Sequence, residues 1–272
     1  MLHPRGSIRL LVHLMNRIYL GAIGCTRGGR DLETSEEAAL SPEEIRRAAS
    51  LRHLPARRRF VAGRWLARTM LSGLMDVPGP MIPISISSGG RPVLEEGGAW
   101  SFSISHSGDI AVCAVSDIPV GVDVERVASR HAMMDIAREF FHPREAKAVA
   151  ERLAVQGADQ AAELFTAYWT LKEAHLKRRG EKVWGMKDTP EFSLARAPGK
   201  VFRENGPAWY CLGIPSSALP PFPYLVAVSA GEDGEGVSLS RVELHLRFLL
   251  AGDPPPRVLF RSESAGPPGG RE

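Results

Sequence analysis

Cysteine is scarce in this sequence, and the three cysteines stand far apart. Cys25, Cys113 and Cys211 are odd in number and belong to no Cys-x-x-Cys or Cys/His ligand pattern. A disulfide framework pairs its cysteines and a zinc site needs closely spaced ligands, so neither class is indicated. This cysteine usage predicts a cytoplasmic protein.

The chain also lacks a membrane-spanning run and an excess of charge of one sign. The longest uncharged stretch, 206–230, contains five prolines, which break a spanning helix. The apolar stretch near the N-terminus is interrupted by Arg9, His13 and Arg17 and is followed by no clean cleavage site, so we expect no signal peptide. With 34 basic and 31 acidic residues the net charge is only +3, which calls for neither a nucleic-acid nor a membrane partner. The 44% of apolar residues is typical of a globular protein.

Two helices and a group of strands are predicted in the first half of the chain. Ser41 and Glu44 form a capping box, and apolar residues follow at helical spacing to Leu74, with Pro55 dividing the stretch into two helices. Between 101 and 125 the period becomes that of strands, in SFSIS, IAVCAVS and VGVDVE. These segments predict an antiparallel meander.

The second half of the chain alternates helices and strands. Helices are predicted at 143–153 and 159–179, separated by Gly157, and a strand-rich remainder follows to about 250. The fragment LVAVS at 225–229 resembles VCAVS at 112–116, which suggests a duplicated α/β unit with a central strand late in each half. From 252 onward the Pro- and Gly-rich sequence predicts a disordered tail.

Two carboxylates mark the strand VGVDVE. Asp123 and Glu125 are two residues apart, so both project from one face of the strand. Two carboxylates on one face suit Mg²⁺, which takes oxygen ligands. Taken alone, the pair is also typical of a solvated strand end.

The segment WTLKEAHLK carries a second candidate group. Trp169, Glu173 and Lys177 are four residues apart and share one helix face, where Glu173 is placed to pair with Lys177. An exposed helix with a surface ion pair is the alternative, although the aromatic Trp169 indicates a partly buried face. Lys172 lies one step off this face and is expected to be solvated.

Hydroxyl, histidine and arginine side chains offer possible phosphate contacts. The run Ser103 to Gly108 presents small donors at a strand end, and a polar turn is the equal alternative. Ser105 and His106 point to opposite sides of a strand, which argues against a Ser-His-Asp triad. Eight arginines between 46 and 68 suit phosphate or simply form a solvated helix face, whereas Arg91 follows two glycines that allow close approach of a ligand.

Five motifs in a fixed order carry a family resemblance. They are G-R-P (90–92), S-I-S-H-S (103–107), V-G-V-D-V-E (120–125), F-F-H-P-R-E (140–145) and W-T-L-K-E-A-x-x-K (169–177). Together they resemble the 4′-phosphopantetheinyl transferase superfamily, in particular its larger, monomeric subfamily that activates peptide and polyketide synthases such as surfactin synthetase. The resemblance spans about 41–230.

The resemblance implies an α+β fold of two similar halves related by pseudo-twofold symmetry. Each half would have an antiparallel three-stranded sheet and a long helix, with the active site at their interface; we expect the halves at 1–119 and 120–250 and a disordered tail at 251–272. The implied reaction transfers 4′-phosphopantetheine from coenzyme A to a serine of an apo carrier protein and releases adenosine 3′,5′-bisphosphate. A monomer that acts without nucleic acid or membrane is expected.

The resemblance also implies roles for individual residues. Mg²⁺ would be held by Asp123, Glu125 and Glu173, and Glu173 would also be the general base, directly or through water. The catalytic group would consist of Glu173, His106 and Lys177. Contacts to coenzyme A would come from Ser105, His106 and Lys177 at its phosphates and from Arg47, Arg59 and Arg91 at its nucleotide end.

The sequence departs from the family pattern at two positions, and two other functions are alternatives. Glu44 stands where some relatives carry a basic residue, and Phe60 stands where a small polar residue occurs, so the nucleotide contacts can differ here. One alternative is a Mg²⁺-dependent phosphohydrolase in which water replaces the carrier serine. The other is a non-catalytic module that binds coenzyme A or a nucleotide. Such a module would have no need for three carboxylates.

Overall fold

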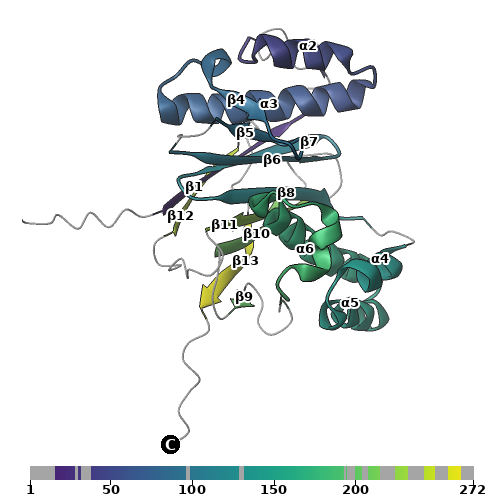
Figure 1. Cartoon of the computed structure of the whole chain (residues 1–272). Coiled ribbons are helices and arrows are strands. Elements are labelled where there is room, and N and C mark those ends of the chain that lie inside the picture. Colours follow the sequence, from purple (N-terminus) through teal and green to yellow (C-terminus); the bar gives the residue numbers. More distant parts are fainter. Residues whose placement is uncertain are drawn as a thin grey trace, which may run out of the picture.

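The protein is described here by a computed structural model that covers residues 16–27, 30–31, 38–95, 99–128, 132–192, 194, 200–203, 208–214, 224–231, 242–248 and 257–264. Two β-sheets are stacked face to face, and helices cover the outer side of each (Figure 1). Among the described residues, no helix combines the length and the apolar character needed to cross a bilayer. The uncharged stretch 206–230 instead contains two β-strands.

The outer layer next to the first sheet consists of α2 (Pro42–Ser50) and α3 (Leu54–Met75). The predicted capping box is confirmed: the Ser41 hydroxyl accepts the Glu44 N–H at 3.3 Å, and the Glu44 carboxylate accepts the Ser41 N–H at 3.1 Å. Pro55 lies in the first turn of α3, where its missing N–H leaves no helical bond unmade. The predicted pair of helices is therefore confirmed. Before α2, the short strand β2 (Thr26–Arg27) pairs with β3 (Arg30–Asp31). After α3 come the short helix η1 (Gly79–Met81) and the paired strands β4 (Ile84–Ile86) and β5 (Pro92–Leu94).

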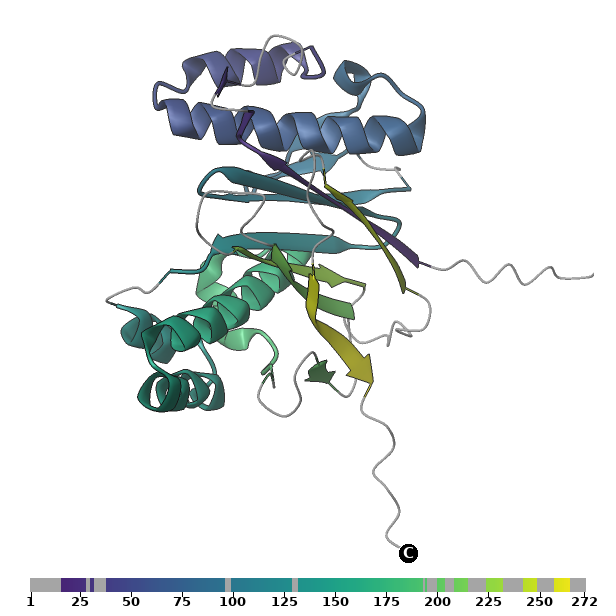
Figure 2. The ribbon, with the colours of Figure 1, turned by 180° about the vertical axis from the view of Figure 1, so that it is seen from behind.

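The first sheet has four strands in the order β12 (Val242–Phe248), β1 (Asn16–Gly24), β7 (Ile110–Ser116) and β6 (Ser101–Ser107). β7 pairs with β1 and β6 in antiparallel fashion, and β12 joins β1 in parallel. Figure 2 shows β1 and β12 side by side. A strand from the second half of the chain thus completes the first sheet, and the expected boundary at 119 does not separate the sheets.

The second sheet has five strands in the order β8 (Val120–Arg126), β11 (Tyr224–Ala230), β10 (Ala208–Ile214), β13 (Arg257–Ser264) and β9 (Lys200–Arg203). Most pairings in the two sheets are antiparallel, as expected, and the pairs β1–β12 and β9–β13 are parallel. Within the described residues the sheets have four and five strands, so the expectation of three strands in each is wrong. The similarity of VCAVS and LVAVS does correspond to two internal, fully buried strands, β7 and β11.

The predicted meander is correct for β6 and β7 and wrong for β8. β8 pairs with β11 along its whole length, from Val120 opposite Ala230 to Arg126 opposite Tyr224. Its valines pack between the sheets in one core with the inward-facing side chains of β1, β7 and β11. β8 is therefore the edge strand of the second sheet, next to β11.

α6 (Ala158–Arg179) packs against β8 and β11 of the second sheet, and α4 (Met133–Phe140) and α5 (Pro143–Gln156) pack on α6 (Figure 1). The short helix η2 (Val183–Asp188) follows α6. The predicted break at Gly157 is confirmed, and its φ of 87° suits glycine. Gly121 allows β8 and α6 to approach closely, because a side chain there would overlap the Ala174 carbonyl oxygen and the Arg178 nitrogen. α6 is therefore fixed against the strand that carries Asp123.

The expected disordered tail contains an ordered strand. β13 pairs with β10 on one side and with β9 on the other, so the expectation is wrong for 257–264. Val258 and Phe260 have high strand propensity, and the surrounding Pro and Gly residues hide this short segment in the composition. Residues 251–256 and 265–272 lie outside the described residues.

Candidate functional site

The two sheets meet where β6 lies beside β8, and serine side chains connect these strands. The N–H groups of Val120 and Val122 donate to the Ser101 and Ser103 hydroxyls at 3.2 and 3.1 Å. The Arg126 N–H donates to the Ser107 hydroxyl at 3.2 Å. This register shows that the strands run in the same direction. It places Asp123 and Glu125 directly opposite the last serines of β6.

Asp123 lies at the centre of a compact polar group. Its side chain is buried, and Oδ1 accepts hydrogen bonds from Ser105 Oγ at 2.8 Å and Lys177 Nζ at 2.7 Å. Lys177 Nζ also donates to Ser105 Oγ at 2.8 Å. Lys177 therefore forms an ion pair with Asp123, whereas the helical spacing alone suggested Glu173 as its partner.

Glu125 and Glu173 complete the carboxylate group. Glu125 Oε2 accepts the Ser107 hydroxyl at 2.9 Å, so Asp123 and Glu125 share one face of β8 as predicted. The pKa of Glu173 is raised to about 7, first by burial and then by the negative charges of Asp123 and Glu125, while Lys177 opposes the shift. Glu173 lies on α6, the helix that packs against β8.

These carboxylates fit a hard divalent cation. Asp123 Oδ2 is buried and accepts no hydrogen bond from the described residues, an arrangement that usually needs an additional partner. Oxygen donors are the ligands that Mg²⁺ and Ca²⁺ prefer. Within the part of the chain that the structure describes, no three His, Cys, Asp or Glu side chains are already spaced as metal ligands. A cation would therefore have to draw the carboxylates together.

A cavity of about 800 Å³ opens on the other side of β6, next to α2 and α3. Its walls include Arg47, Phe60, Arg64 and Gly90, and His106 projects into it from β6. The side-chain alternation that sends Ser105 to β8 thus sends His106 to this cavity, in agreement with the argument against a triad. Burial lowers the pKa of His106, and the positive charges of Arg59 and Lys177 contribute in the same direction.

Arg91 connects the cavity wall with α6. Its guanidinium donates a hydrogen bond to the Lys177 carbonyl oxygen near the end of that helix, and burial lowers the pKa of Arg91. The structure therefore places Arg47 and His106 at the cavity, Ser105 and Lys177 at Asp123, and Arg91 between the two groups. Arg59 acts on His106 through its charge.

Glu44, one of the two departures from the family pattern, is buried and paired. Glu44 Oε2 lies 2.5 Å from Arg68 Nε, and Oε1 lies 3.5 Å from Arg64 Nη1. The Arg68 guanidinium also donates to the Gly79 and Ile82 carbonyl oxygens at 2.6 and 3.0 Å. Two arginines therefore compensate the negative charge that Glu44 brings to the cavity wall, and Arg64 presents a cation there that sequence reasoning did not single out.

The expectation that Lys172 is solvated is wrong. Its ammonium is buried, lies 2.9 Å from Glu145 Oε2 and donates to Thr189 Oγ1 at 2.8 Å. α5 and the residues after η2 cover this side of α6, and Glu145 also accepts the N–H groups of His142 and Phe192. Glu145 belongs to the F-F-H-P-R-E motif, which was the available signal for its role.

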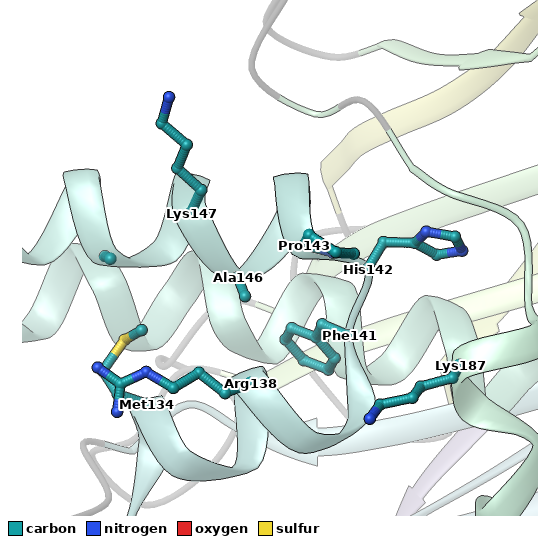
Figure 3. Close-up of a pocket in the computed structure, with 9 residues that line it drawn as sticks. Met134, Arg138, Phe141, His142, Pro143, Ala146, Lys147 and Lys187 are labelled. Atoms are coloured by element: carbon teal, nitrogen blue, oxygen red, sulfur yellow. The ribbon is translucent and has the colours of Figure 1, made fainter.

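A second cavity of about 580 Å³ lies between α4, α5 and η2 (Figure 3). Phe141, Met134 and Ala146 line it together with the basic residues Arg138, Lys147 and Lys187. The residues predicted for the site do not line this cavity. The candidate site is therefore the junction of β6, β8 and α6 together with the cavity next to α2 and α3.

The sequence is similar to known proteins of one described family. A family model described as the 4′-phosphopantetheinyl transferase superfamily matches residues 119–217, and one described as the 4′-phosphopantetheinyl transferase N-terminal domain matches residues 43–116. The chain is 34% identical over 180 residues to the 4′-phosphopantetheinyl transferase HetI of Nostoc sp., a match that covers 64% of this chain and 73% of the relative. It is 30% identical over 156 residues to a 4′-phosphopantetheinyl transferase of Bacillus subtilis, covering 56% and 67%. A phosphopantetheinyl transferase of Thraustochytrium sp. is 30% identical over 237 residues, covering 83% and 76%.

Proposed function

Because this chain belongs to the 4′-phosphopantetheinyl transferase superfamily, we propose that it transfers the 4′-phosphopantetheine group of coenzyme A to a serine of an apo carrier protein. The second product is adenosine 3′,5′-bisphosphate. The observation that supports the proposal most directly is the ion pair of Lys177 with Asp123 at the junction of β8 and α6, with Glu125 on the same face of the strand as Asp123. Of the other functions considered, neither the phosphohydrolase nor the binding module is favoured by the relatives.

The cavity next to α2 and α3 is the proposed site for the nucleotide end of coenzyme A. Arg47 and His106 line it, and Arg59 adds positive charge close to His106. Arginine binds phosphate through two parallel N–H groups, which suits the charged 3′-phosphate. Arg91 lies between this cavity and the carboxylates, and Ser105 and Lys177 contact Asp123, where the pyrophosphate would lie.

Asp123, Glu125 and Glu173 are the proposed ligands of Mg²⁺. The buried Asp123 Oδ2, which accepts no hydrogen bond, supports this assignment. When bound, the cation would neutralise negative charge on the pyrophosphate oxygens as the phosphorus–oxygen bond to the adenosine side breaks. Lys177 contributes a second positive charge next to Asp123.

Glu173 is the proposed general base for the carrier serine. Before a cation binds, burial and the charges of Asp123 and Glu125 raise the pKa of Glu173 to about 7, so this carboxyl has a higher proton affinity than an exposed glutamate. Glu173 takes the hydroxyl proton, directly or through water, while the serine oxygen bonds to the β-phosphorus of coenzyme A. The bridging oxygen leaves with the adenosine bisphosphate. The nucleophile belongs to the carrier protein, so this chain needs no nucleophilic residue.

Intact-mass spectrometry of apo carrier proteins incubated with the protein, coenzyme A and Mg²⁺ tests the proposal. We expect a gain of one phosphopantetheine group that disappears with EDTA and in Asp123→Ala and Glu173→Ala. Asp135→Ala is the matched control, since Asp135 is an exposed carboxylate paired only with Arg138 among its described hydrogen bonds. Full transfer by both site variants would contradict the proposal. Faster hydrolysis of coenzyme A without a carrier would favour the phosphohydrolase, and coenzyme A binding without transfer would favour the binding module.

We further propose that the protein acts as a monomer without nucleic acid or membrane, and that its halves are related by pseudo-twofold symmetry. The similar positions of β7 and β11, each internal in its sheet, support the symmetry. Sedimentation equilibrium tests the oligomeric state. Superposition of β6–β7 with α3 on β8–β11 with α6 tests the relation of the halves.

A further inference from the structure

The four serines of β6 fall into two groups. Ser101 and Ser103 accept N–H groups of β8 and make no bond to a carboxylate among the described contacts. Ser105 and Ser107 donate their hydroxyl protons to carboxylates, at Asp123 and Glu125 respectively. The same strand therefore provides backbone anchors at its start and carboxylate contacts at its end.

We propose, on the basis of the function proposed above, that Ser107 is a positioning residue that orients Glu125 for the divalent cation. A hydroxyl has one proton to donate and can accept other hydrogen bonds at its oxygen. At Ser107 the oxygen accepts the Arg126 N–H at 3.2 Å, and the proton goes to Glu125 Oε2 at 2.9 Å. The backbone of β8 thus fixes the hydroxyl that in turn holds the carboxylate of the same strand.

Ser107 matters more for Glu125 than Ser105 does for Asp123. Asp123 has a short, buried side chain, so its carboxylate has little freedom to lose. Glu125 is longer and only half-buried, so its carboxylate has more rotational freedom to lose when it binds a cation. A group that orients a metal ligand in advance reduces that loss, which is why outer hydrogen-bond partners affect metal affinity.

Four variants separate this role from ordinary stabilisation. Ser107→Ala removes the hydrogen bonds of the hydroxyl to Glu125 and to the Arg126 N–H. Ser101→Ala removes only the acceptor of the Val120 N–H. Ser107→Thr and Ser107→Val form an isosteric pair in which only the first retains a hydroxyl. The full chain is mixed with coenzyme A and Mn²⁺, and free Mn²⁺ is measured by electron paramagnetic resonance, with the thermal midpoint recorded for every variant.

We expect the Mn²⁺ dissociation constant to rise about tenfold in Ser107→Ala and Ser107→Val, as for other outer-shell partners of metal ligands. Ser107→Thr and Ser101→Ala should bind Mn²⁺ like the wild type, while Ser101→Ala loses about as much thermal stability as Ser107→Ala. Equal Mn²⁺ affinity of the Thr and Val variants would overturn the inference and leave the proposed function intact. Absence of Mn²⁺ binding to the wild type would overturn the metal assignment and the inference together.

Discussion

Lys172 and Glu145 form an ion pair at 2.9 Å in which neither side chain is more than 1% exposed. The pair joins α6 to the first turn of α5, and Thr189 extends it to the residues after η2. Phe141 and Phe192 lie beside the ammonium, with ring centroids 5.9 and 5.6 Å from Nζ. Since Glu173 follows Lys172 directly, this buried pair helps to fix the helix that carries the proposed base.

Replacement of Lys172 by Met should lower the free energy of unfolding by about 3–5 kcal/mol, because Glu145 would remain buried without its counter-charge. The double variant Lys172→Met with Glu145→Gln should be more stable than Lys172→Met alone. Urea denaturation measures both. Lys147→Met is the control, because Lys147 lies in an exposed pair with Glu151. This variant should have the same free energy of unfolding as the wild type. A midpoint of Lys172→Met equal to that of this control would contradict the prediction.

Gly121→Ala should disturb the contact between β8 and α6. The new methyl group would overlap backbone atoms of Ala174 and Arg178, which cannot move without displacing the helix. We expect lower stability together with loss of transfer. Gly73→Ala is the matched change in α3, where nothing lies within 4 Å of the new methyl group, and it should stabilise the protein by about 0.5–1 kcal/mol. Thermal unfolding of the two variants should therefore shift in opposite directions.

The raised pKa of Glu173 makes the stability of the metal-free protein depend on pH. Between its ordinary value of 4.5 and about 7, the folded protein retains a proton that the unfolded chain has lost, so stability falls as pH rises. Glu173→Gln removes this penalty, which at pH 8 has an upper limit on the order of 3 kcal/mol. Urea denaturation in EDTA should show that the free energy of unfolding of the variant, relative to that of the wild type, is higher at pH 8 than at pH 5. A constant difference between the two proteins would contradict the pKa shift.

Cys25 should resist alkylation in the folded protein. Burial raises the pKa of its thiol to about 12, so very little reactive thiolate exists at pH 8. Cys113 is also buried, and burial raises its pKa too. Peptide mass spectrometry after iodoacetamide treatment should find both unmodified in buffer and both modified in 8 M urea. Rapid labelling of either cysteine in buffer would show that α3 does not cover the first sheet as described.

Local features of the fold were predictable because their signals are local. The Ser41 capping box, the break at Gly157 and the common face of Asp123 and Glu125 each depend on a few neighbouring residues. Strand pairing is different: alternation shows which face of β8 is apolar but not which strand lies beside it. The same reason explains why the parallel pairing of β12 with β1 could not be anticipated.

The family motifs singled out candidate residues for the site but not the contacts between them. Helical spacing paired Lys177 with Glu173, whereas the structure pairs Lys177 with Asp123. Lys172 is the clearest example of a contact that the sequence does not reveal, because its partner Glu145 is 27 residues away in the sequence. Burial of a lysine by a distant carboxylate leaves no periodic signal.

The parallel pairing of β12 with β1 also has a consequence for biosynthesis. A ribosome releases 16–24 long before 242–248, so the nascent chain presents β1 with one uncovered edge during most of its translation. Open strand edges pair readily with other chains, which makes this interval a period of risk for aggregation. Completion of the first sheet is thus a late event of synthesis, and a ribosome that stalls before residue 242 leaves a chain that cannot close its first sheet.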